Sequence, residues 1–101
     1  MKFGLPDTTL SAIRNVFAHY KKAEKVILFG SRAKGNFKPG SDIDLAIDGK
    51  DLSIDDILAL KISLDALHLP YTIDLIKYGS ITDADVLEHI QRVGVDIYPH
   101  N

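Results

Sequence analysis

Apolar residues recur along the chain with two different periods, one typical of helices and one typical of strands. Over residues 8–22 they recur every three or four positions, which predicts a helix with one buried face. The same spacing returns over residues 54–67 and 82–92, which predicts two further helices. Residues that favour a helix N-terminus stand at the start of each segment, namely Asp7 or Thr8, Ser53, and Ser80 or Thr82.

Strands are predicted between these helices. Residues 26–29 form a continuous apolar run that ends at Gly30, as expected for a buried strand. Further strand segments are predicted at residues 42–47, 71–77 and 95–98. After Gly30 a polar, basic stretch predicts one helical turn followed by a loop. The alternation of helices and strands predicts an α/β fold with a central sheet flanked by helices.

Length and composition predict a single domain over residues 1–101, because about 100–150 residues is the usual size of one domain. The absence of cysteine excludes a disulfide framework, a thiolate zinc site and a cysteine nucleophile, and it favours the cytoplasm. No apolar run approaches the roughly 20 residues of a membrane span, and the start lacks the apolar core of a leader peptide. We therefore expect no membrane association.

Charge is distributed unevenly between the two halves of the chain. The net charge is −2, which argues against a protein made chiefly to coat nucleic acid. Residues 1–50 carry nine Lys and Arg against five Asp and Glu, whereas residues 51–101 carry three against nine. An anionic ligand is therefore expected to meet the first half.

Gly30 and Ser31 stand at the predicted strand-to-helix turn. Glycine allows close approach of a ligand to the backbone, and the serine hydroxyl with free N–H groups can bind a phosphate. Arg32 and Lys34, and more weakly Lys38, are candidate anion contacts. A Gly-Ser pair after a strand is also an ordinary turn, and three cations in a loop can simply be solvated.

Three aspartates are candidate metal ligands. Strand periodicity places Asp42 and Asp44 on one face, where their like charges favour a divalent cation such as Mg²⁺ or Mn²⁺ between them. Asp74 lies in an otherwise apolar strand and should have a partner; it can join the other two if its strand lies beside theirs. The alternatives are solvated aspartates on an exposed face and a salt bridge from Asp74. Together with Gly30 and Ser31, the three carboxylates are typical of a two-metal phosphoryl-transfer site.

The segment FGSRAKG, followed by SDIDLAI, resembles the signature of minimal nucleotidyltransferases of the DNA polymerase β superfamily. Ten residues separate Ser31 from Asp42, and the resemblance extends over nearly the whole chain. It implies a mixed sheet and transfer of AMP from ATP, with two Mg²⁺ ions, to a hydroxyl acceptor. It also implies that Asp42, Asp44 and Asp74 bind metal, that Asp74 can accept a proton, and that Gly30 and Ser31 grip the triphosphate.

The same resemblance implies a protein partner. Stand-alone proteins of this kind are commonly paired with a helical HEPN-domain toxin, which they neutralise as type VII-like antitoxins by adenylylating a tyrosine. Two alternatives stay open: a module that masks its partner without catalysis, and a nucleotidyltransferase that acts on a small molecule or an RNA end. The four histidines, His19, His68, His89 and His100, stand at unrelated spacings and are not expected to take part in catalysis.

Overall fold

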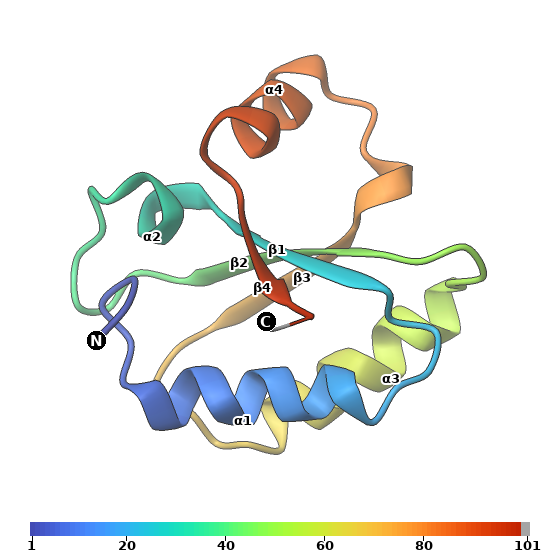
Figure 1. Ribbon diagram of the computed structural model, residues 1–101, viewed down its shortest axis with the longest axis horizontal. Coiled ribbons are helices and arrows are strands. Elements are labelled where there is room, and N and C mark those ends of the chain that lie inside the picture. Colours follow the sequence, from blue (N-terminus) through green and yellow to red (C-terminus); the bar gives the residue numbers. More distant parts are fainter. Residues whose placement is uncertain (100–101) are drawn as a thin grey trace.

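In the computed structural model, which describes residues 1–99, four strands form one mixed sheet with two helices on each face (Figure 1). The order across the sheet is β3-β2-β1-β4. The strands are β1 (Lys25–Phe29), β2 (Ile43–Asp48), β3 (Ile73–Lys77) and β4 (Val95–Tyr98). The helices are α1 (Asp7–Ala18), α2 (Gly30–Lys34), α3 (Ile54–Asp65) and α4 (Ala84–Val93), with a short 3₁₀ helix η1 (Tyr78–Ser80) after β3.

The directions of the strands follow from their connections. β1 runs antiparallel to both β2 and β4, whereas β2 and β3 are parallel. A parallel pair needs a long crossover, and α3 provides it between β2 and β3. β3 is therefore an edge strand that lies directly beside β2, as the prediction for Asp74 required.

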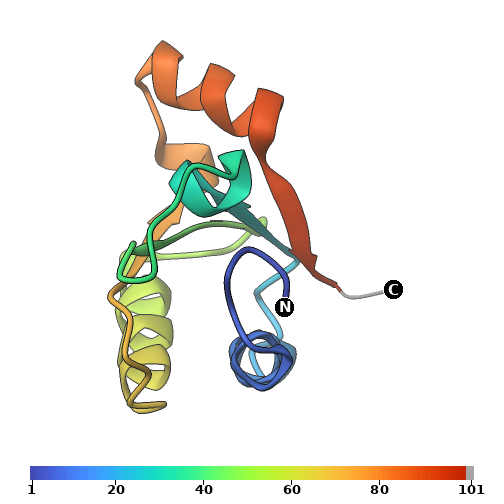
Figure 2. The same ribbon diagram turned by 90° about the vertical axis from the view of Figure 1, so that its left-hand side faces the viewer.

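The larger core lies between the sheet and the pair α1 and α3, which cover the same face (Figure 2). Side chains from both helices and from the strands are almost completely buried there: Leu10, Ile13, Phe17, Leu28, Leu45, Ile47, Leu60 and Leu64. A capping box begins α3, in which the Ser53 side chain accepts from the Asp56 N–H and Asp56 accepts from the Ser53 N–H. The Tyr20 hydroxyl also donates to Asp56, which ties the end of α1 to the start of α3.

Helices α2 and α4 lie over the opposite face (Figure 2). Their core is small, with Ile27, Ala46 and Ile90 as its buried members. Ile90 comes from the one apolar face of α4, which packs on the sheet next to the end of β1. Because Asp44 and Ala46 alternate with the buried Leu45, Asp44 points to the same face as α2 and α4.

The predicted α/β fold, with a mixed sheet of four strands, is confirmed, and the last strand has the predicted bounds. Ends of the other helices and strands differ from the predictions by up to four residues, most clearly at two helices. Helix α1 stops at Ala18, before the predicted end at Lys22. Helix α4 begins after Asp83, whose side chain accepts from the N–H groups of Asp85 and Val86, because residues 78–80 are already in η1. The predicted cap, Ser80 or Thr82, is therefore wrong, because the Asp83 side chain makes the capping bonds.

Helix α3 has apolar residues on more than one face. Its inward side chains Leu60 and Leu64 are buried, whereas Ile54, Leu58 and Ile62 are 77%, 56% and 69% exposed. Among residues 1–99, no helix has both the length and the apolar character needed to cross a membrane.

Candidate active site

Asp44 and Asp74 lie opposite each other on neighbouring strands. They are directly paired in the parallel register of β2 and β3, where adjacent strands are about 4.8 Å apart. Burial raises the pKa of the Asp44 carboxyl above its ordinary value, and the charges of Asp74 and Asp42 raise it further. The structure therefore places two mutually repelling carboxylates side by side on β2 and β3.

Gly30 forms the wall of this site opposite Asp74. It begins α2 with a φ of +76°, in the left-handed region that glycine tolerates. A β-carbon on Gly30 would overlap the Oδ2 atom of Asp44. The turn after β1 and the carboxylate on β2 are therefore in direct contact, and only glycine leaves room for both.

Ser31 and Lys34 follow Gly30 in α2. Ser31 is half-buried, and Lys34 is exposed. Chain connectivity keeps Ser31 beside the Gly30 and Asp44 contact. The structure thus brings the Gly-Ser turn, Asp44 and Asp74 together, although they come from three separate parts of the sequence.

Asp42 lies outside this contact. It is exposed and directly precedes β2, so the predicted strand begins one residue later, at Ile43. It lies about 7 Å along the chain from Asp44. Within residues 1–99, no three His, Asp or Glu side chains are arranged so that they alone could hold a metal ion.

These carboxylates nevertheless fit magnesium in their chemistry. Mg²⁺ prefers hard oxygen ligands and is usually bound by one or two carboxylates together with substrate phosphates. The repelling pair Asp44 and Asp74 supplies such oxygens, and the raised pKa of Asp44 indicates a charge that a cation would relieve.

Arg32 has a different place from the one predicted. Its side chain is 1% exposed and donates to the backbone carbonyls of Phe3, Pro39 and Ser41. Its guanidinium also lies over the rings of Phe37 and Tyr71. The expectation that Arg32 contacts an anion does not agree with this placement, because the guanidinium is used to hold the N-terminal segment and the loop before β2. Lys38 is exposed in that loop.

His89 reaches the site, although nothing in its sequence surroundings indicated this. Its Nε2 atom accepts a hydrogen bond from the Gly30 N–H at 3.0 Å, and its ring contacts Phe29 edge-on. The two partners are 59 positions apart, so no local spacing could relate them. Of the other histidines, His19 and His68 are exposed, and His100 lies outside the described residues.

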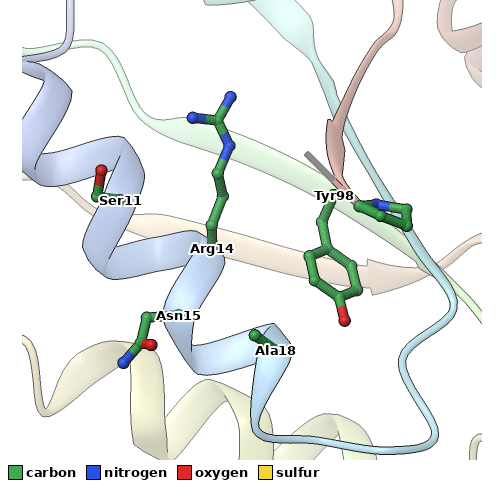
Figure 3. Close-up of a pocket in the computed structure, with 6 residues that line it drawn as sticks. Ser11, Arg14, Asn15, Ala18 and Tyr98 are labelled. Carbon is green, nitrogen blue, oxygen red and sulfur yellow. The ribbon is translucent and has the colours of Figure 1, made fainter. Parts of the chain in front are cut away.

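A surface hollow lies away from this chemistry. It has a volume of about 440 Å³ and lies between α1 and β4 (Figure 3). Ser11, Arg14, Asn15, Ala18, Tyr98 and Pro99 line it. Arg14 is already held there by a 2.8 Å bond from its Nε to the Ile97 carbonyl. None of the predicted site residues lines this hollow.

Solved structures share this fold. A chain of a toxin–antitoxin complex with AMP-PNP is 22% identical, with a TM-score of 0.70, and the match covers 96% of this chain and 76% of that one. A chain from a complex of tri-AMPylated Shewanella oneidensis HEPN toxin with MNT antitoxin is 21% identical, with a TM-score of 0.67 and coverages of 92% and 71%. At these identities the likeness concerns the fold. A search of curated proteins found no match.

The sequence itself matches a protein family along most of its length. Residues 11–101 match the family described as "Polymerase beta, Nucleotidyltransferase". This region holds all four strands, the Gly30 turn and the paired carboxylates Asp44 and Asp74. The chain therefore belongs to the polymerase beta nucleotidyltransferase family.

Proposed function

We propose that this protein transfers AMP from ATP to a hydroxyl group of a HEPN-type partner protein, and so acts as an antitoxin. The observation that carries this proposal is the direct contact of Gly30 with Asp44, together with the pairing of Asp44 with Asp74. A turn suited to phosphate and a carboxylate pair suited to a cation thus meet at one edge of a nucleotidyltransferase fold.

In this proposal Asp42, Asp44 and Asp74 hold two Mg²⁺ ions together with the triphosphate. Bound Mg²⁺ supplies charge neutralisation for the phosphates and makes the attacking hydroxyl easier to deprotonate. Gly30 and Ser31 hold the β- and γ-phosphates, and the exposed Lys34 contributes a positive charge beside them. Asp42 directly precedes Ile43 at the start of β2, two residues from Asp44, and is proposed as a further metal ligand on that ground.

The reaction is a displacement at the α-phosphorus of ATP. The acceptor hydroxyl oxygen forms a bond to the α-phosphorus. The bond between the α-phosphorus and the oxygen that bridges to the β-phosphate breaks, and pyrophosphate leaves. Asp74 takes the proton of the hydroxyl. Its exposed position on the edge strand β3 is open to an acceptor from another molecule.

Two structurally similar complexes support a protein acceptor. One holds a tri-AMPylated HEPN toxin with an MNT antitoxin, and another is a toxin–antitoxin with AMP-PNP. Tyrosine is the proposed acceptor residue, ATP the proposed donor and the cytoplasm the expected compartment.

Intact-mass spectrometry tests the proposal. The protein is incubated with a HEPN-domain partner, ATP and Mg²⁺, and Asp44→Ala serves as the catalytic control. Additions of AMP to the partner that the control lacks are the expected result. A stable complex without any added mass would instead favour a module that masks its partner, and the exposed Ile54, Leu58 and Ile62 of α3 would then be its first candidate contacts. Transfer to a small molecule or RNA without any partner would favour the remaining alternative.

A further inference from the structure

The N–H of Gly30 donates a hydrogen bond to the side chain of His89, which lies 59 positions later in the sequence. The first N–H groups of a helix have no partner within the helix, and Gly30 is the first residue of α2. Here Nε2 of His89 accepts at 3.0 Å. A nitrogen that accepts carries no proton, so the bond requires the neutral ring with its proton on Nδ1.

The imidazole of His89 is held in place by packing. It meets the Phe29 ring edge-on, with 6.2 Å between the ring centres and an angle of 77°. The next residue, Ile90, is 3% exposed and packs with Ile27 and Ala46 under α4. Gly94 ends the helix closely against Ile90 and Ile27. Helix α4 therefore presents His89 to the turn from a supported position rather than from a loop.

His89, Gly30 and Asp44 thus form a continuous chain of contacts across three elements. His89 binds the Gly30 N–H on one side, and the Asp44 carboxylate fills the space at the Gly30 α-carbon on the other. A rotation of the Gly30 peptide would break the bond to His89. The orientation of Ser31, which follows in the chain, depends on that peptide.

We infer that His89 is a positioning residue for nucleotide binding, which fixes the Gly30 peptide so that the Gly30–Ser31 turn and Asp44 face one triphosphate together. This inference rests on the proposed function only so far as that turn binds a nucleoside triphosphate; it does not depend on the acceptor. The bond persists when nucleotide binds.

The test is isothermal titration calorimetry of Mg·AMP-PNP with four proteins, each first shown to be folded. These are the wild type, His89→Leu, His89→Gln, and His19→Leu as a matched removal of an exposed histidine. Loss of one acceptor from a partly buried N–H predicts about tenfold weaker binding in His89→Leu. The Gln amide oxygen can accept in place of Nε2, so His89→Gln should bind within about threefold of wild type. His19→Leu should bind as the wild type does.

A merely structural His89 would lower the melting temperature of His89→Leu but leave the affinity of the folded protein unchanged, and this result would overturn the inference. Equal or tighter binding by His89→Leu would also overturn it, because His89 would then block the turn. The inference would also be overturned if His89→Gln bound Mg·AMP-PNP as weakly as His89→Leu does, or if the wild type bound no Mg·AMP-PNP. If His89→Leu does not fold, His89→Met replaces it. In the wild type, a through-bond NMR coupling between the Gly30 amide nitrogen and Nε2 of His89 is expected, and its absence would refute the geometry.

AMP-PNP binding separates this inference from the transfer reaction. Wild type that binds Mg·AMP-PNP with the expected pattern of variants, but adds no AMP to a partner, would contradict the proposed acceptor and leave the role of His89 supported.

Discussion

The carboxylate of Asp44 occupies the space that a β-carbon on Gly30 would need. One residue comes from the turn after β1 and the other from the start of the neighbouring strand β2. Because the same glycine also has a φ of +76°, both its backbone conformation and its surroundings exclude a side chain. The proposed phosphate grip and the proposed metal ligand are thus parts of one packed unit.

Replacing Gly30 should therefore disrupt the site as well as strain the backbone. Gly30→Ala is expected to abolish AMP transfer, because the added methyl group displaces the Asp44 carboxylate. Gly35→Ala is the matched control, since Gly35 also has a positive φ, of +97°, but open space around its α-carbon. The control should lose only about 1–2 kcal/mol of unfolding free energy. Equal activities of the two variants would contradict the proposed contact between Gly30 and Asp44.

Neutralising Asp44 should stabilise the protein while it removes activity. Its pKa is raised by burial and by Asp74 and Asp42, so the folded protein loses stability as the pH rises from the unfolded value of about 3.9 through the folded value. Asp44→Asn is thus expected to melt at a higher temperature than wild type at pH 7 without metal or nucleotide. This gain should shrink as the pH falls towards about 4.

AMP transfer by Asp44→Asn is expected to fall to background. Asp48→Asn, at the exposed end of the same strand, should change neither property. Thermal melts over pH 4–8 measure the stability effect. A lower melting temperature for Asp44→Asn at pH 7 would mean that the carboxylate is stabilised by its neighbours and is not repelled by them.

Arg32 and Lys34 should separate stability from ligand binding. Lysine cannot reproduce the bonds from Arg32 to the carbonyls of Phe3, Pro39 and Ser41, so Arg32→Lys should cost about 3 kcal/mol or more in urea unfolding. Lys34→Ala should leave stability within about 0.5 kcal/mol and weaken ATP binding several-fold. The opposite pattern, a stable Arg32→Lys that has lost ATP affinity, would restore Arg32 to the anion site.

The capping box of α3 makes the protein sensitive to acid. Bonds from Ser53 and Tyr20 hold the pKa of the Asp56 carboxyl well below its usual range. A carboxyl with a lowered folded pKa stabilises the protein above its unfolded value of about 3.9, and this contribution is lost as the pH falls through the folded value. Asp56→Asn should therefore be less stable than wild type at pH 7, with the difference narrowing below about pH 4.

Ser53→Ala removes the other half of the same box and should cost about 1 kcal/mol. Equilibrium unfolding at a series of pH values measures both effects. A difference between wild type and Asp56→Asn that stays constant from neutral to acidic pH would show that the Asp56 charge has no part in the capping.

Features of the fold with a local signal in the sequence were predicted correctly. The alternation over residues 42–47 correctly put Asp44 on the face opposite Leu45, and Ser53 was correctly identified as a cap, because both features depend on neighbours within four positions. The prediction was less accurate at the start of α4. The sequence indicates Ser80 or Thr82 as the cap, whereas Asp83 takes this role through its bonds to the first N–H groups of the helix.

By itself, the sequence determined the order of helices and strands, the motif of Gly30, Ser31, Asp42 and Asp44, and through that motif the family. Only the tertiary structure decided that Asp74 lies beside Asp44, that Arg32 is buried among backbone carbonyls, and that His89 binds Gly30. The physical reason is the separation along the sequence over which each kind of interaction acts. Periodicity and capping act between residues a few positions apart, whereas strand order and side-chain contacts depend on how the whole chain packs its apolar faces.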